Sequence, residues 1–173
     1  MDHIFDQIKG TLEAGFPYAA IMLALSVPDI CASLALPANA NDGAQKKRYL
    51  RWYRENVLPR FDVLSDEDVW SLRCGVVHEG AFGNKDKTFD RVIFCGDGHQ
   101  GIMSVHDSTI NGVHYDRLLI IGATLFCEKI IESAFSWFEK NRGSPNVKAN
   151  LWKLVGTYSE GIPPLIGGVT CVG

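Results

Sequence analysis

An arginine and a histidine stand five positions apart in the segment Arg73-Cys74-Gly75-Val76-Val77-His78. If residues 66–79 form a helix, Arg73 falls inside its apolar arc. A guanidinium does not lose its proton, so burial requires a carboxylate, a phosphate or carbonyl groups beside it. His78 would lie in the last helical turn, where the helix dipole favours the protonated imidazole and draws its pKa toward neutrality or above. Such a pair could hold a phosphate and transfer a proton.

The two side chains would point about 140° apart on one helix, so a single copy cannot easily aim both at one point. Two copies that meet across a twofold axis could bring two arginines and two histidines together. Gly75 between them allows close approach of another backbone or a ligand. Asp29 is the lone charge of another apolar stretch, so we expect it to pair with Arg73, with Glu128 as the alternative. An Asp29 partner would shift the role of Arg73 toward orienting the site.

The patterns around these residues predict a mainly helical chain. Ser65 and the three acids after it are typical of a helix N-terminus, and Gly80 is typical of a helix end. The expected helices cover 3–14, 18–36, 44–58, 66–79, 116–141 and 146–155, and the expected strands cover 89–95, 102–106 and 109–114.

The composition suits one globular unit. The chain has 173 residues, of which 46% are hydrophobic and 21% charged. We therefore expect a single domain over 1–173, a helical bundle with a small antiparallel β insertion at about 89–114 before the long C-terminal helix. An extended tail is expected over about 156–173. The stretch 16–36 is apolar enough to suggest a membrane span, but it contains Pro28 and Asp29, which favour a buried helix.

Charge and cysteine content narrow the function classes. The net charge of −3 gives no global reason to bind nucleic acid, so an RNA contact would need a local basic patch. Five cysteines without a CxxC pair indicate reduced thiols and a cytoplasmic location. Cys74 and Cys127 have apolar neighbours and are interpreted as packing residues rather than nucleophiles.

A basic stripe in the third expected helix is the candidate patch. Lys47, Arg51 and Arg54 share one helix face, and Arg48 lies beside them. With Trp52 and its neighbour Tyr53 interleaved, the stripe could follow an RNA backbone while the aromatic rings stack on bases. The favoured interpretation is a solvated helix face with Trp52 in the core.

A glycine-rich segment, Gly96–Gly101, spells GxGxxG after a predicted strand. No helix is expected to follow it, so a glycine-rich hairpin turn is favoured over a dinucleotide site. The spacings of Cys95, His99, His106 and His114 match no recognised zinc pattern. We therefore predict no metal and no cofactor.

The segments 26–31, 48–52, 72–80 and 161–164 resemble the HEPN superfamily, and more closely an uncharacterised bacterial HEPN-like family. The resemblance implies an all-α bundle and a homodimer that cleaves RNA without metal in a bacterial defence or toxin–antitoxin system. It also implies an antitoxin or another protein partner. Arg73 would hold the scissile phosphate, and His78 would act on the 2′-hydroxyl or the 5′-oxygen, giving a 2′,3′-cyclic phosphate. Asp29, Cys74 and Glu79 would support them. Many active members carry a polar residue where this chain has Cys74.

Two alternatives stay open. Some HEPN domains are non-catalytic and bind nucleotides or proteins. The chain could also be a structural interaction module that uses the expected hairpin. A pair of Arg73–His78 clusters open to solvent would favour the enzyme, whereas an Arg73 sealed in the core of a monomer would favour the other two.

Overall fold

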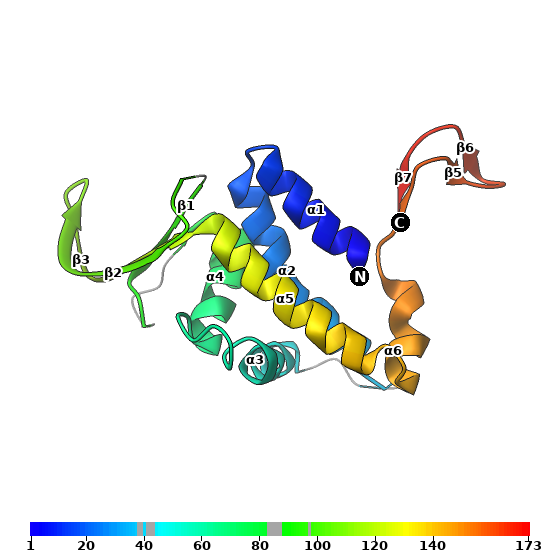
Figure 1. Ribbon diagram of the computed structural model, residues 1–173, viewed down its shortest axis with the longest axis horizontal. Coiled ribbons are helices and arrows are strands. Elements are labelled where there is room, and N and C mark those ends of the chain that lie inside the picture. The colour runs from blue at the N-terminus through cyan, green and yellow to red at the C-terminus, as the bar shows by residue number, and fades with distance from the viewer. Residues whose placement is uncertain (38–39, 41–43, 83–87, 97) are drawn as a thin grey trace.

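The computed structural model describes residues 1–37, 40, 44–82, 88–96 and 98–173. Within these ranges the chain forms helices around a central helix, with a three-stranded sheet at one end and a C-terminal segment at the other (Figure 1). The helices are α1 (Asp2–Glu13), α2 (Pro17–Leu34), α3 (Gln45–Asn56), α4 (Asp66–His78), α5 (Ala123–Asn141) and α6 (Pro145–Asn150), followed by the 3-10 helix η1 (Leu151–Lys153). The main strands are β1 (Arg91–Cys95), β2 (Ile102–Ile110) and β3 (Val113–Gly122). The short ones are β4 (Thr157–Tyr158), β5 (Gly161–Ile162), β6 (Ile166–Gly167) and β7 (Cys171–Val172).

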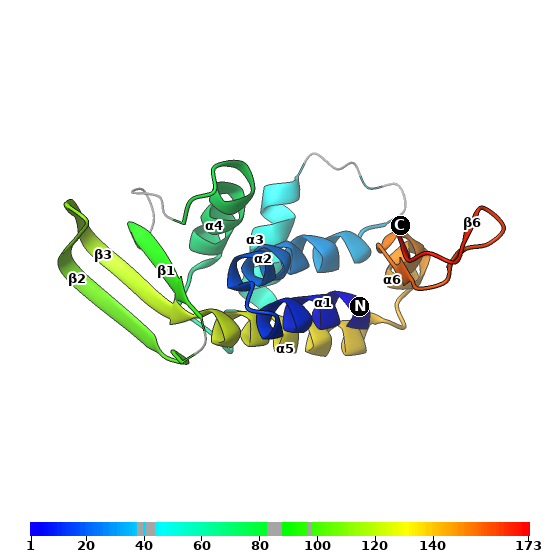
Figure 2. The same cartoon turned by 90° about the horizontal axis from the view of Figure 1, so that it is seen from above.

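Helix α2 is the centre of the helical part. It packs against α1, α3, α4, α5 and α6, and Figure 2 shows it between α4 on one side and α1 and α5 on the other. Its side chains Ile21, Leu25 and Val27 are buried in the core. Pro28 lies inside the helix without ending it, and the Ser26 hydroxyl donates to the Leu23 carbonyl of the same helix.

By length and composition alone, α2 could cross a membrane, and it is the one such helix in the described ranges. In the described ranges, α2 also contacts more of the other helices than any other helix does, which is typical of a core helix. This arrangement is compatible with a soluble protein.

The expectation of a mainly α-helical bundle is wrong. Among the residues that the structure describes, about 51% are helical and about 20% are in strands, so the fold is a mixed α/β fold. The main error concerns residues 116–122, which we expected to begin the long helix and which instead belong to β3. The run Leu118–Ile121 is apolar on every side because β3 is the central strand and its second half, which holds this run, is largely buried. A short apolar run of this kind does not distinguish a buried strand from a helix.

The sheet is also not antiparallel throughout. Its order is β1-β3-β2, in which β2 and β3 form an antiparallel hairpin while β1 and β3 run parallel. The hairpin turns at Asn111-Gly112, where both residues have positive φ, as a two-residue turn of this kind requires.

The segment 96–101 connects β1 to β2, which flank β3, so the expectation of a hairpin turn there is wrong. Asp97, within the GxGxxG pattern, lies outside the described residues. His99 lies against the start of α5, because a Cβ built on Gly122 would collide with the His99 carbonyl oxygen.

The C-terminal part begins with a firm attachment to α2. The Asn150 side-chain amide donates to the carbonyls of Leu34 (3.1 Å) and Leu36 (2.8 Å), and that of Asn146 donates to Ala35 (3.1 Å). Beyond η1, the expected extended tail instead forms two small antiparallel ladders, β4 with β7 and β5 with β6.

Candidate functional site

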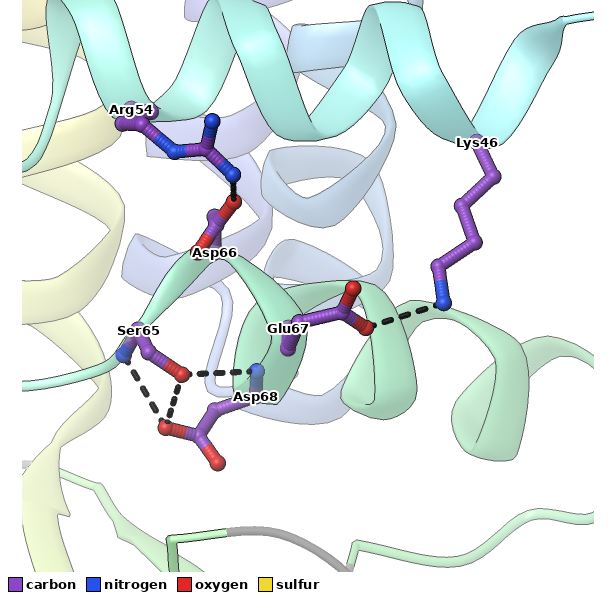
Figure 3. Close-up of polar contacts among 6 residues, drawn as sticks. All are labelled: Lys46, Arg54, Ser65, Asp66, Glu67 and Asp68. Carbon is purple, nitrogen blue, oxygen red and sulfur yellow. Dashed lines mark hydrogen bonds and ion pairs between the residues drawn. The ribbon is translucent and has the colours of Figure 1, made fainter.

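Helix α4 begins as the sequence predicts. The Ser65 hydroxyl accepts from the Asp68 N–H (3.1 Å), and the Asp68 carboxylate accepts from the Ser65 N–H (3.0 Å), which forms a capping box (Figure 3). The second oxygen of Asp68 accepts from the N–H of Thr88 at 2.9 Å, so the same carboxylate also holds the chain before β1. The start of α4, and therefore the position of its later residues, is fixed by these bonds.

Arg73 contacts Asp29, as expected from the two isolated charges. The Arg73 Nε and one terminal nitrogen lie 3.2 and 3.1 Å from the same oxygen, Oδ2 of Asp29. Glu128, which we named as the alternative partner of Arg73, lies on α5 and lines a different cavity. The pairing joins the C-terminal half of α2 to the middle of α4.

Two aromatic rings and a glutamine complete the surroundings of this pair. The guanidinium carbon of Arg73 lies 5.3 Å from the ring centroid of Trp70, and Trp70 packs edge-on against buried Tyr49. The Gln45 amide donates to the other oxygen of Asp29 at 3.4 Å. We call Asp29, Gln45, Trp70 and Arg73 the Asp29–Arg73 site.

Burial dominates the electrostatics of this site. It raises the pKa of the Asp29 carboxyl above its ordinary value, while Arg73, the Gln45 hydrogen bond and the charge of Arg48 each oppose the rise. The net direction means that the folded protein stabilises the Asp29 charge less well than water does. Such a carboxylate depends strongly on the cation that accompanies it.

The site is half-buried and reaches the surface. The side chains of Arg73 and Asp29 retain 22% and 17% of their accessible area. A small cavity of about 210 Å³ lies beside Asp29 and is also lined by residues of α6, η1 and the segment after it: Asn150, Lys153 and Leu154. The carboxylate is therefore accessible from the side of α6.

The C-terminal end of α4 is closed by the chain that follows it. The Gly75 carbonyl accepts from the N–H groups of Glu79 (2.8 Å) and Ala81 (3.2 Å), and Gly80 between them has φ +63°. A Cβ on Gly75 would come within 2.6 Å of the Ala81 carbonyl oxygen. The expected close approach at Gly75 is confirmed, and the group that approaches is the chain's own backbone.

His78 is the last residue of α4, so its expected place at the helix end is confirmed. Its side chain, like that of Val77, lies outside the described part of the structure. Two residues before His78, the carbonyl of Val76 accepts from the hydroxyl of Tyr18 at 3.2 Å, and Tyr18 packs edge-on against Phe82.

The basic stripe is partly neutralised by α4. Arg54 of the stripe pairs with Asp66, and Lys46, which precedes the stripe on α3, pairs with Glu67 at 2.9 Å (Figure 3). Arg48 acts on Asp29, while Lys47 and Arg51 are exposed. The ring of Trp52 is buried in the core, as the favoured interpretation predicts, and that of Tyr53 is buried as well, so neither ring can stack on bases.

The remaining candidates form no centre in the described ranges. These ranges contain no group of three or more His, Cys, Asp or Glu residues that could hold a metal ion. Cys127 is buried, which raises the pKa of its thiol to about 12, and Cys74 is half-buried. Both positions fit the expectation of packing residues.

Sequence reasoning missed three residues of this region. Trp70 could have been found, because it precedes Arg73 by one helical turn and can cover its guanidinium. Gln45 lies on α3 and reaches Asp29 on α2, whereas Tyr18 lies on α2 and reaches Val76 on α4. No local sequence pattern indicates such contacts between different helices.

The sequence matches no protein-family model, no curated protein and no solved structure.

Proposed function

We propose that this chain is a metal-independent endoribonuclease of the HEPN type that acts in the cytoplasm as a homodimer through the Arg73/His78 region. The observation that carries the proposal is the placement of Arg73. A permanent cation is held on α4 by Asp29 and Trp70, with part of its surface exposed, five residues before a histidine at the helix end. A phosphodiester offers the acceptor oxygens that such a cation can bind.

The chemistry proposed for this pair is a transesterification. One imidazole removes the proton of the ribose 2′-hydroxyl, and the 2′-oxygen attacks phosphorus. The bond to the 5′-oxygen breaks, and a protonated imidazole donates a proton to that leaving group. Arg73 stabilises the negative charge on the phosphorus oxygens. The products are a 2′,3′-cyclic phosphate and a 5′-hydroxyl. A base and an acid are needed at once, and two copies of His78 would supply both roles.

A second candidate is a non-catalytic HEPN domain that binds a nucleotide or a protein. It is favoured by the commitment of two Arg73 nitrogens to Asp29. In this case Arg73 orients the site and does not capture a phosphate. Lys47 and Arg51, which are exposed on α3, would then supply the electrostatic attraction to RNA.

The test is a cleavage assay with a chelator present, using single-stranded RNA labelled at one end. We expect wild type to cut and His78→Ala to lose at least a hundredfold in rate, the range of a general acid–base group. The matched control is His114→Ala, because His114 is exposed on the distant β2–β3 hairpin and should be dispensable. Fragments must end in a cyclic phosphate, which resists phosphatase until acid opens it.

The outcomes separate the candidates. Binding of labelled RNA without cleavage supports the non-catalytic domain. Equal cutting by wild type and His78→Ala indicates a contaminating nuclease and removes the support for the enzyme. We also propose that the chain belongs to a bacterial defence or toxin–antitoxin system with an antitoxin or other protein partner. Copurification of a neighbouring gene product that inhibits cleavage would test this part.

A further inference from the structure

The C-terminal segment exposes an unusual amount of apolar surface. We call residues 151–173 the C-terminal arm. Trp152 is 79% exposed and Leu165 is 81% exposed. Half of the exposed large hydrophobic side chains of the described chain lie in this arm: Trp152, Val155, Tyr158, Leu165, Ile166, Val169 and Val172.

The arm is ordered by its own hydrogen bonds. Gly156 and Gly173 exchange two backbone hydrogen bonds, of 2.7 and 3.1 Å, beside the β4–β7 ladder. The strands of the arm contact mainly one another, and Figures 1 and 2 show them projecting beyond α6, away from the other helices. Each ladder has two strands, so every strand of the arm keeps one edge without a partner strand in the described chain.

The arm carries almost no charge. Of its 23 residues, only Lys153 and Glu160 have charged side chains. Transient interfaces are about as polar as the rest of a protein surface, whereas homodimer interfaces are more apolar and poor in charge. The composition of the arm therefore fits a homodimer interface better than a transient interface with a different protein.

The exposed area is also of the right size. The seven side chains present on the order of 600 Å² of apolar surface, judged from their exposed fractions and the area that such side chains bury. A stable interface covers about 800 Å² on each partner. Soluble monomers seldom leave apolar patches larger than a few hundred Å² uncovered.

We propose that the C-terminal arm is a homodimerisation element and that a second copy of this chain covers it. A twofold axis would place the same arm on both sides, so the apolar side chains and open strand edges of one copy meet those of the other. This contact is separate from the α4 region that the ribonuclease proposal uses, and it does not depend on cleavage. The two contacts together would build an assembly larger than a dimer.

The test is sedimentation velocity of the full chain without RNA, over about 1 to 100 µM, where micromolar association is resolved. We expect wild type to dimerise or to form a larger assembly. Val169→Asp should weaken association at least tenfold, because it places a charge in the apolar contact. Val113→Asp is the matched control, since Val113 is 52% exposed on the β2–β3 hairpin and Val169 is 55% exposed in the arm.

Leu165→Asp is a second arm variant, so the result does not rest on one position. Far-UV circular dichroism checks that each variant is folded. A wild-type chain that stays monomeric at the highest concentration overturns the proposal. Equal association of wild type and both arm variants, or equal weakening by Val113→Asp, also overturns it. His78→Ala should associate like wild type, which separates this proposal from the failure or success of the ribonuclease.

Discussion

Removing the cation from the Asp29–Arg73 site should cost more stability at neutral pH than in acid. Arg73→Met deletes the hydrogen bond and the ion pair to Asp29, whose carboxylate has only 17% of its area exposed. Breaking a fully buried ion pair costs roughly 3–5 kcal/mol. Because the Asp29–Arg73 site is partly exposed and Gln45 remains as a donor, we expect a loss of about 2 kcal/mol at pH 7.

The sign of the pH dependence follows from the pKa of Asp29, which burial raises in the folded state. Between the unfolded and the folded pKa the folded chain binds more protons, so its stability falls as pH rises through that window. Loss of Arg73 removes an interaction that lowers the pKa of Asp29 in the folded state. The pH range between the unfolded and the folded pKa therefore extends to higher pH. The deficit of Arg73→Met should therefore shrink as pH falls, with a slope no steeper than about 1.4 kcal/mol per pH unit for one proton.

The assay is urea unfolding of wild type and Arg73→Met at several pH values between 7 and 4. Arg142→Met is the matched control, because Arg142 pairs with Glu139 on the exposed face of α5 and should cost about 0.5 kcal/mol or less. Asp29→Asn should cost less than Arg73→Met, since the amide oxygen still accepts from Arg73, and the guanidinium that remains keeps its contact with the Trp70 ring. A deficit of Arg73→Met that is equal at pH 7 and pH 4 would refute the reasoning.

Three other substitutions test the surroundings of the site by urea unfolding. Gly75→Ala should cost about 1–3 kcal/mol, because its methyl group would collide with the Ala81 carbonyl. Gly10→Ala, in the open interior of α1, should instead stabilise by about 0.5–1 kcal/mol, and equal effects at both glycines would contradict the packing argument. Ser65→Ala should cost about 1 kcal/mol through loss of the cap, and no change would mean that the capping box is dispensable. Tyr18→Phe should cost about 1 kcal/mol by leaving the Val76 carbonyl without its donor, and a neutral result would show that water replaces the hydroxyl.

Local signals in the sequence predicted the helices that carry the site. The start of α4 was recognisable because Ser65 and Asp68 have the spacing of a capping box. The Asp29–Arg73 contact was predictable because each residue is an isolated charge in an apolar stretch, and two such charges avoid the cost of burial together.

The sheet was not predictable by the same means. The parallel pairing of β1 with β3 depends on contacts between distant segments, and no local pattern specifies it. The turn at Asn111-Gly112 did carry a strong hairpin signal, which would have extended the strand through residues 116–122. The buried run in β3 was assigned to a helix despite that signal, because it is apolar on both faces and lacks the alternation that is typical of a half-exposed strand.

The amides of Asn146 and Asn150 have a practical consequence for dissecting this protein. They donate to the carbonyls of Leu34, the last residue of α2, and of Ala35 and Leu36 just beyond it, where a helix end leaves carbonyl groups to be satisfied by other partners. A truncation before residue 145 would therefore uncap the central helix and loosen the backbone that carries Asp29. A chain that stops after Lys153 keeps these bonds, so it is the better boundary for removing the four strands of the arm while preserving the site.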